Sequence, residues 1–420
     1  MSTTTASSGP GAQLWTILGL AVAAQTAGSI VSQGVYTLVP VFREAFGLSQ
    51  AEAALAVTVM NGGQILSLFT LGRLIDRHGE RAVVAIAMAG MGLMAMAGAM
   101  LATGYASLLL ALLLLGVCYA AVQPGGTRAI LRWFPTRHRG LATGFRQAAV
   151  PLGTALAAML LPLLAASGGW RAALLAQGGI GIAGGLFFWA FYREGDLAES
   201  RKAPPLPLRQ LLAVLGRDPA FWPVLGAGIA MSSFQFTFTA SAIAFMAERF
   251  GLGLVAAAAL FAIVQFTGIP SRALLPMVVD RLWPGRREHC LGWVMALCTA
   301  LTALYALLPA ETPAWALYPV LALLGIFGIG WFPLYLLQIA EIAPKNAIAT
   351  TVGFSSTLCM IAMALAPLAF GAVVDAGGYG LAWGLLVLPV GLLVPRLLRL
   401  PAREGREPQD QEPVRPAAGS

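Results

Sequence analysis

Three arginines lie well inside long apolar segments of the sequence: Arg128, Arg146 and Arg272. An arginine at the centre of a membrane helix costs about 2.5–3.5 kcal/mol on insertion scales, so it normally faces a water-filled cavity or an anionic partner. Each of the three stands six to eight residues from the polar end of its segment, which is about 9–12 Å along a helix. We therefore expect the three side chains to occupy one layer inside the protein.

The sequence shows no counter-ion for these arginines. No Asp or Glu lies deep in an apolar segment, and Glu52, Glu341 and Asp375 stand at or near segment ends. Arginines held close together in a low dielectric repel one another and need an anion. The planar guanidinium suits two-pronged binding of a carboxylate. A small organic anion is therefore the predicted partner. The structural alternatives are a role in a gate for Arg128 and contacts to the Gln147 region or to helix ends for Arg146.

The composition indicates that most of the chain lies in a membrane. Of its 420 residues, 58% are hydrophobic and only 10% are charged, whereas soluble domains carry about 25% charged residues. A spanning helix takes about 20 apolar residues. The sequence predicts twelve such helices, near 14–37, 50–73, 82–103, 106–133, 140–167, 171–192, 220–246, 253–279, 290–309, 313–340, 347–372 and 379–399. The predicted fold is an all-α membrane protein with twelve transmembrane helices in two pseudo-symmetric six-helix bundles.

The breaks in hydrophobicity divide the chain into five parts. We predict a disordered tail (1–13), an N-terminal bundle (14–192), a cytoplasmic linker (193–219), a C-terminal bundle (220–400) and a disordered cytoplasmic tail (401–420). With both termini in the cytoplasm, 20 of the 26 Lys and Arg residues fall on that side, three fall outside and three lie within helices. This bias follows the positive-inside rule. It also accounts for the net charge of +8, so membrane lipid and no nucleic acid is expected around the protein.

Two sequence patterns recur in the two predicted bundles. Asp76-Arg77 and Asp280-Arg281 each follow the second predicted helix of their bundle, 204 residues apart. The segment Ala142–Gln147, which opens the fifth predicted helix, recurs 209 residues later as Thr351–Ser356. Two repeats of six helices, with a binding site near the membrane midplane between them, are a common build of secondary transporters.

The loop Gly72–Arg81 resembles the loop signature of the major facilitator superfamily, and Asp280–Arg287 is similar to a weaker copy of it. Trp133-Phe134-Pro135, with Gly140 and Gly144 after it, resembles that family's junction of helices four and five. The resemblance covers residues 14–400 and implies a transporter whose loop motifs form a cytoplasmic gate. The gate residues that it implies are Gly72, Asp76, Arg77, Gly79, Arg81, Asp280 and Arg281.

Two of the arginines resemble substrate-binding arginines in the organic-anion branches of that family. Arg128 is similar to the helix-four arginine of the anion:cation symporters, and Arg272 to the helix-eight arginine of the monocarboxylate transporters and the oxalate–formate exchanger. Gly268 stands where the monocarboxylate transporters carry a proton-coupling Asp. The segment Leu112–Gly116 lacks the Arg-x-x-Gln-Gly motif of many drug and sugar exporters. These departures favour an organic anion over a drug, and leave the coupling ion open.

Four polar residues on helices that line the cavity in that family complete the predicted substrate contacts. They are Gln33, Tyr36, Gln123 and Tyr335. Isolated polar residues in membrane helices also serve as contacts between helices, which is the structural alternative for each of them.

Neither a metal site nor an enzyme active site is predicted. The four cysteines stand singly, and the sequence contains no nucleophile–base pair or cofactor-binding loop. The predicted function is secondary active transport of a small mono- or dicarboxylate by alternating access, as an exchanger or a symporter, without a cofactor. The predicted location is a bacterial-type cytoplasmic membrane, and the predicted state is a monomer. A proton-driven drug or metabolite exporter of the same fold and a non-transporting membrane receptor remain as alternatives.

Overall fold

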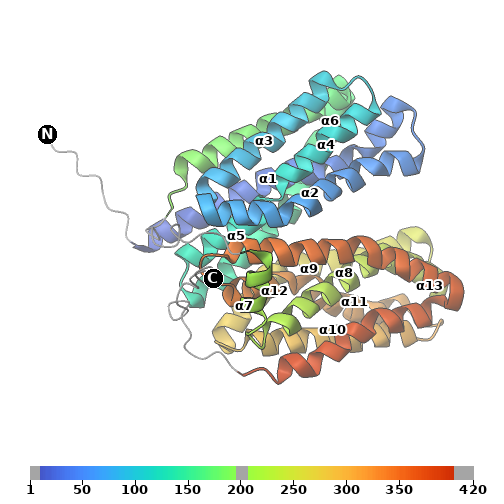
Figure 1. Cartoon of the computed structure of the whole chain (residues 1–420). Coiled ribbons are helices and arrows are strands. Elements are labelled where there is room, and N and C mark those ends of the chain that lie inside the picture. The colour runs from blue at the N-terminus through green and yellow to red at the C-terminus, as the bar shows by residue number, and fades with distance from the viewer. Residues whose placement is uncertain (1–9, 195–206, 402–420) are drawn as a thin grey trace. The chain divides into compact units, whose positions relative to one another are not determined.

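The computed structural model describes residues 10–194 and 207–401, and within these ranges the chain forms helices and no strand. Figure 1 shows the helices in chain order. Their bounds are α1 (Pro10–Phe46), α2 (Gln50–His78), α3 (Glu80–Leu101), α4 (Tyr105–Tyr119), α5 (Val122–Trp133), α6 (Thr136–Phe191), α7 (Leu208–Leu215), α8 (Phe221–Arg249), α9 (Leu254–Leu282), α10 (Arg287–Leu307), α11 (Ala314–Gly330), α12 (Phe332–Ile342) and α13 (Ile348–Leu398). Residues 1–9 and 402–420 of the predicted tails, and 195–206 of the predicted linker, lie outside the described residues.

The described parts of the predicted tail and linker contain helix where none was expected. Residues 10–13, predicted as part of the tail, belong to α1. The short helix α7 lies inside the predicted linker and buries Leu211 and Leu215. Two apolar residues four positions apart face the same side of a helix. A search for spanning segments misses such an element because it is far shorter than a membrane crossing.

Ten helical stretches in the described ranges are long and apolar enough to span a membrane. Two of them have double length, because α6 contains 56 residues and α13 contains 51. The helical backbone is interrupted at Gly168 and Gly169 in α6 and at Gly378 in α13, with φ angles of +68° at Gly169 and +76° at Gly378. Glycine adopts such angles without steric cost. Each double-length helix therefore contains two crossings, which gives the predicted twelve for the described residues.

The fourth crossing of each repeat consists of two helices. In the first repeat, α4 and α5 are separated at Ala120–Ala121, and in the second, α11 and α12 are separated at Trp331. Pro124 and Pro333 follow these breaks and are 209 residues apart, the same spacing as the recurring segments that open the fifth helix. Proline lacks the amide hydrogen that would bond to the carbonyl four residues earlier, so helices kink there. Interrupted helices at corresponding places of two repeats point to a binding region.

The helices pack into two compact units. Unit 1 comprises Met1–Pro135 and Ala149–Lys202, and unit 2 comprises Thr136–Ala148 and Ala203–Ser420. Unit 1 differs from the predicted N-terminal bundle, 14–192, in the segment Thr136–Ala148. The start of α6 therefore packs with unit 2, whereas the rest of the same helix belongs to unit 1.

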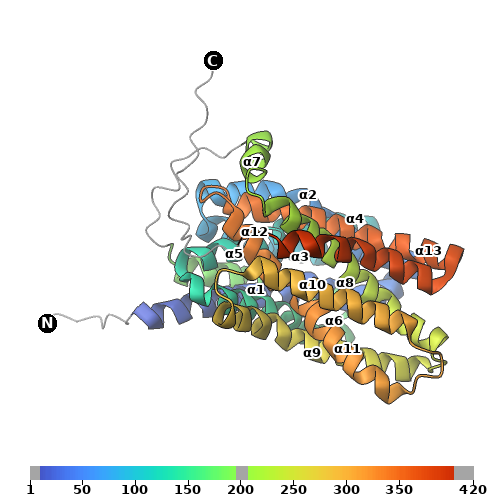
Figure 2. The same ribbon diagram turned by 90° about the horizontal axis from the view of Figure 1, so that it is seen from below.

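Close helix contacts hold each unit together. In unit 1, α2 lies along α4, where Gly116 faces the Met60 carbonyl with no room for a side chain. In unit 2, α8 lies along α13 and α9 lies along α11 (Figure 1 and Figure 2). The rings that surround Trp383 have centroids within 6.0 Å of its own. They belong to Phe238, Phe245, Tyr305 and Phe370. Small residues such as Gly116 allow helix backbones to approach closely in a membrane, where packing drives helix association.

We define the basic end of each unit by its interhelical junctions. The basic end of unit 1 carries the junction of α2 and α3 at Gly79, and that of unit 2 carries the junction of α9 and α10 at 283–286. The two predicted loop motifs span these junctions, and the residues around them form the ion-pair networks described below.

Candidate functional site

Arg272 lies within α9, on the face opposite a stripe of exposed apolar side chains. The stripe consists of Phe266, Pro270, Leu274 and Val278, and helical periodicity places Arg272 about half a turn away from it. The residue is half-buried, and its Nε is enclosed without a hydrogen-bond partner. Within residues 10–194 and 207–401, no hydrogen bond or ion pair reaches its guanidinium. Arg272 is therefore a membrane-depth cation directed away from the apolar outer surface.

Two prolines loosen α9 around this arginine. Pro270 and Pro276 both lie inside the helix, and each removes one backbone hydrogen bond to the carbonyl four residues earlier. For Pro276 that carbonyl belongs to Arg272. The start of α6 approaches the same backbone, since a methyl group on Gly144 would lie 2.7 Å from the Arg272 oxygen and 2.6 Å from the Ala273 Cα. Glycine at 144 thus allows α6 to contact α9 beside Arg272.

Arg146 belongs to the same region of unit 2. It follows Gly144 by two residues on α6, and its side chain is fully buried. The structure thus places Arg146 and Arg272 on two helices that touch at Gly144. Two guanidinium groups in this low-dielectric interior raise the local positive potential, which favours an anion.

The prediction that no protein carboxylate reaches the arginine layer is wrong for Arg128. Its Nη1 lies 3.4 Å from Asp76 Oδ1 and also donates to the Ile75 carbonyl, and its Nε lies 3.7 Å from Glu80 Oε2. All three charged side chains are nearly fully buried. The prediction counted only the residues between the end of the helix and the arginine Cα. A long arginine side chain reaches well past its own Cα, here to carboxylates at the ends of α2 and α3.

A second arginine and a tyrosine complete this network in unit 1. Arg132 Nη1 lies 2.9 Å from Glu80 Oε1, and the Tyr192 hydroxyl donates to the same oxygen at 2.9 Å. Burial, and then the neighbouring Glu80 carboxylate, raise the pKa of the Tyr192 phenol. Together with Asp76 and Arg128, the network holds two carboxylates and two guanidinium groups, so its charges balance. This arrangement supports the structural alternative for Arg128, while its predicted substrate contact remains an untested prediction.

The other predicted gate residues of unit 1 surround this network. Gly79 separates α2 from α3 with a φ of +89°, and its amide donates to the Ile75 carbonyl at 2.8 Å. Gly72 is buried and Arg77 is exposed. Arg81 donates its Nε to the Trp189 carbonyl at 2.8 Å, and its guanidinium lies over the Trp189 ring. The loop motif thus links α2, α3 and the end of α6 at the basic end of unit 1.

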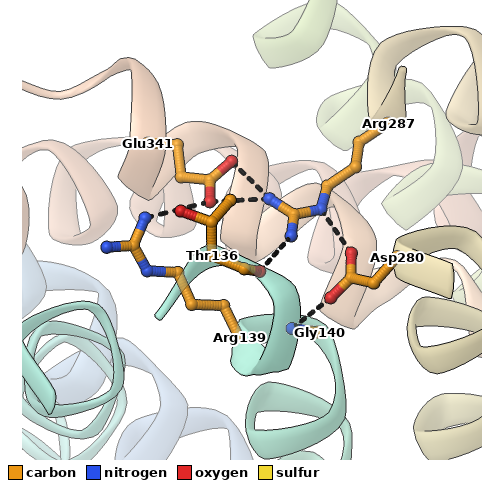
Figure 3. Close-up of polar contacts among 6 residues, drawn as sticks. All are labelled: Thr136, Arg139, Gly140, Asp280, Arg287 and Glu341. Carbon is orange, nitrogen blue, oxygen red and sulfur yellow. Dashed lines mark hydrogen bonds and ion pairs between the residues drawn. The ribbon is translucent and has the colours of Figure 1, made fainter. Parts of the chain in front are cut away.

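In unit 2, Asp280 and Arg287 form the centre of the corresponding network (Figure 3). Arg287 Nε donates to Asp280 Oδ1 at 2.7 Å, and its Nη1 donates to both Glu341 oxygens at 2.6 Å. The other oxygen of Asp280 accepts a hydrogen bond from the Gly140 amide at 2.8 Å. An aspartate beside the first turns of α6 is also favoured by the helix dipole.

Two residues from the start of α6 join the same network. Arg287 Nη2 donates to the Thr136 carbonyl at 3.0 Å, and Arg139 Nη1 lies 3.4 Å from Glu341 Oε1 (Figure 3). The network therefore fastens Thr136–Ala148 to α9, α10 and α12 within unit 2. Arg281, the basic residue predicted for this gate, is exposed instead. Arg287 takes the inward position because it is the first residue of α10.

Each network contains an ion pair at the corresponding place of its repeat. The charges of the two partners are exchanged between the repeats. Glu80, the first residue of α3, pairs with Arg132 near the end of α5, whereas Arg287, the first residue of α10, pairs with Glu341 near the end of α12. Arg132 and Glu341 are 209 residues apart, the spacing of the repeat. The repeat has thus kept the position of the pair while exchanging the signs of its partners, which no single-position pattern in the sequence reveals.

The four polar candidates differ in accessibility. Tyr36 is exposed, and its hydroxyl accepts a hydrogen bond from Asn61 at 2.8 Å. Gln33 and Gln123 are half-buried. Tyr335 is fully buried, packs against Gly228, and places its hydroxyl 3.3 Å from the Cys359 sulfur. Tyr335 is therefore part of the packed interior of unit 2 in this structure, whereas the other three remain accessible.

Metal-binding geometry is not found in the described part of the chain, where no three His, Cys, Asp or Glu side chains converge. The polar chemistry of the chain is thus concentrated in the two balanced networks at the basic ends and in the Arg146 and Arg272 region. The first can fasten helices, and the second can receive an anion.

Comparison with known proteins agrees with this architecture. The family model for the Major Facilitator Superfamily matches residues 17–367. An uncharacterized MFS-type transporter of Mycobacterium tuberculosis is 27% identical over 409 residues, which cover 93% of this chain and 87% of that protein. The gallate transporter of Pseudomonas putida is 28% identical over 180 residues, which cover 43% of this chain and 40% of that protein.

A solved structure shows the same fold at low sequence identity. The crystal structure of the human organic anion transporter MFSD10 matches with a TM-score of 0.72 and 17% identity, covering 91% of this chain and 99% of that one. The relatives are transporters rather than enzymes. Because the family model spans most of the sequence, this chain belongs to the Major Facilitator Superfamily of multi-pass membrane transporters.

Proposed function

We propose that the protein transports a small organic anion, a mono- or dicarboxylate, by alternating access, and that Arg272 is its principal anion contact. The observation that carries this proposal is the enclosed Arg272 Nε, which has no hydrogen-bond partner within the described ranges. An arginine at membrane depth whose enclosed Nε lacks a partner is costly. A carboxylate offers two oxygens in the geometry that a guanidinium binds best.

Arg146 supports the same assignment from the adjoining helix. Its helix touches α9 at Gly144, beside the Arg272 carbonyl. A bound carboxylate would lower the electrostatic cost of having two arginines in this region. The relative named as a gallate transporter shows that an organic acid is a substrate type found among similar proteins.

The coupling mode that we propose is exchange, or symport in which protons accompany the substrate. Gly268 lies one turn before Arg272, and a methyl group on it would lie 2.8 Å from Ile329 Cβ of α11. It offers no carboxylate for proton binding. The anion itself would then be the group that changes the charge of the site in each transport cycle.

We also propose that the basic ends of both units face the cytoplasm of a bacterial-type inner membrane, with both termini on that side. The support is the bias of 20 Lys and Arg residues against three, because loops rich in Lys and Arg stay inside.

Thermal unfolding of the purified protein against a panel of small carboxylates tests the anion site. A ligand at about 100 times its Kd stabilises the folded state by about 2.7 kcal/mol, and we expect at least one carboxylate to raise the melting temperature. Arg272→Ala should abolish the shift, Arg272→Lys should reduce it, and Arg281→Ala, at the exposed end of the same helix, should retain it. Stabilisation by lipophilic cations and by no carboxylate would contradict the proposal and favour an exporter of drugs.

A further inference from the structure

A long apolar groove runs between α8 and the two crossings of α13 in unit 2. Its volume is about 400 Å³, within the range of about 300–1,000 Å³ that is typical of small-molecule sites. Each wall is one face of a helix, since the lining positions follow helical spacing in all three segments. They are Gly226, Ile229, Ala230 and Ser233 on α8, Ala366, Ala369, Phe370 and Val373 on the first crossing of α13, and Ala382, Leu385, Leu386, Pro389 and Leu393 on the second.

Small side chains create this groove where large ones would close it. Gly226, Ala230, Ala366 and Ala369 line it on two of the three walls. In membrane proteins such residues normally bring helices into contact, yet here they border open volume. Ala369 and Leu385 are themselves exposed, so the groove opens sideways at the apolar surface of the crossings. Its lining offers a ligand almost nothing but hydrocarbon.

Basic residues stand at one end of the groove. A methyl group on Gly226 would lie 3.3 Å from Leu393, so α8 and the last crossing of α13 touch there. The two helices run antiparallel, because the end of α8 meets the start of that crossing where the Tyr379 hydroxyl donates to Glu248. Trp222, one turn before Gly226, and Arg396, one turn after Leu393, therefore both lie beyond this contact on the same side.

This side is the basic end of unit 2. Leu398 of α13 packs against Gly292 of α10, five residues from Arg287 of the ion-pair network. Arg396 and Arg399 are exposed, and neither forms an ion pair within residues 10–194 and 207–401. Trp222 is 54% exposed. Aromatic and basic side chains at a helix end are the usual composition of the level where lipid head groups lie.

We propose that the groove binds one glycerophospholipid with an anionic head group. Its acyl chain lies between α8 and α13, its phosphate contacts Arg396 and Arg399, and Trp222 lies beside the glycerol. The lipid comes from the leaflet that meets the basic end, where clusters of basic residues near spanning helices attract anionic lipids. An acyl chain that moves from the bilayer interior into the groove stays in a hydrocarbon environment. The arginines must therefore provide the preference for an anionic lipid. This inference requires only the membrane location and is independent of the transported substrate.

Native mass spectrometry of the detergent-purified protein, titrated with phosphatidylglycerol or with phosphatidylcholine of the same chains, tests the proposal. We expect one phosphatidylglycerol to bind preferentially, with a Kd lower by about fivefold for each arginine that contacts the phosphate. Arg396→Gln combined with Arg399→Gln should equalise the two lipids. Arg137→Gln, an exposed arginine at the start of α6, is the matched control and should keep the preference.

A second pair of variants tests the groove itself. Ala369→Phe fills the groove and should weaken binding of both lipids at least fivefold, whereas Ala372→Phe, exposed on the same helix and outside the lining, should not. Equal binding of the two lipids by the unaltered protein would overturn the proposal and indicate unspecific lipid contact. Undiminished binding of phosphatidylglycerol to Ala369→Phe, or a preference that survives loss of both arginines, would overturn it as well.

Discussion

Replacing Arg287 with methionine would remove the centre of the network that fastens the start of α6 in unit 2. The guanidinium donates to Asp280, to both oxygens of Glu341 and to the Thr136 carbonyl. Methionine keeps much of the volume and none of these hydrogen bonds. Asp280, whose side chain is 4% exposed, would then be a buried carboxylate with only the Gly140 amide as a donor among the contacts shown in Figure 3.

The expected cost follows from the burial of the groups left behind. Breaking a buried ion pair by removing one partner costs about 3–5 kcal/mol. The lower value, about 3 kcal/mol, is expected here because Asp280 keeps the Gly140 amide and Glu341 keeps Arg139. Asp280→Asn removes the charge that Arg287 neutralises, so the double variant Asp280→Asn/Arg287→Met should recover part of the loss, by about 1–3 kcal/mol.

Unfolding of the detergent-solubilised protein by titration with a denaturing detergent measures these free energies. The series consists of the unaltered protein, the two single variants, the double variant and Arg281→Met. Arg281 is the matched control, because it is an exposed arginine near the end of α9, next to Asp280. The reasoning is refuted if Arg287→Met costs no more than Arg281→Met, or if the two substitutions at 280 and 287 are additive within about 0.5 kcal/mol.

Three further substitutions test particular contacts by the same unfolding measurement. Gly116→Ala should destabilise the protein by about 1–3 kcal/mol, because the new methyl group would overlap the Met60 carbonyl between α2 and α4. Gly79→Ala should cost about 1–3 kcal/mol, because a φ of +89° with a ψ of 157° is a backbone conformation that essentially only glycine adopts. Tyr192→Phe should cost about 1–3 kcal/mol, because Glu80 would lose a buried hydrogen-bond donor.

Each of these substitutions has an internal comparison. Gly19→Ala on α1 adds a methyl group with nothing within 4 Å, so it should be neutral or slightly stabilising. If Gly116→Ala changes the free energy of unfolding no more than Gly19→Ala does, the packing argument is contradicted. Gly79→Asn should cost about as much as Gly79→Ala, because asparagine tolerates the left-handed helical region but not a positive φ combined with a ψ of 157°; a near-neutral asparagine variant would contradict the backbone argument. If Arg132→Met in the Tyr192→Phe background costs no more than it does alone, the two residues do not stabilise Glu80 jointly.

The twelve crossings could be predicted because each leaves an apolar run of about 20 residues. Even the turns inside α6 and α13 fall at the predicted breaks, since Gly168, Gly169 and Gly378 lie in the gaps between predicted helices. The boundaries were less accurate where helices are short or charged. The helix α7 was not predicted because its eight residues are far fewer than the about 20 of a membrane crossing.

The partners of the arginines could not be predicted from position along a helix. Arg128 reaches carboxylates at the ends of two other helices, and its length carries the charge about a turn beyond its Cα. Arg287 rather than Arg281 pairs with Asp280, and this choice depends on where α10 begins. Glu341 is far from both in the sequence. Pairings of this kind depend on tertiary contacts, for which local spacing carries no signal.

Arg272 could be predicted from the sequence because the direction of its side chain follows from its own helix, without knowledge of tertiary contacts. A lone arginine in an apolar segment of α9, with prolines on either side, must face away from lipid wherever the helix lies. The structure places it opposite the exposed apolar stripe of that helix. What the sequence did not reveal is the approach of α6 at Gly144, which depends on the contact between two helices.

Exchange of a radiolabelled carboxylate in proteoliposomes tests directly whether Arg272 is the anion contact. We expect the unaltered protein to accelerate exchange of at least one small carboxylate. Arg272→Gln should slow it by at least about 30-fold, since truncating one partner of a buried charged pair costs about 2 kcal/mol or more, while Arg137→Gln, at an exposed position of α6, should leave it unchanged. Carboxylate exchange by Arg272→Gln at the rate of the unaltered protein would contradict the assignment of Arg272 as the anion contact.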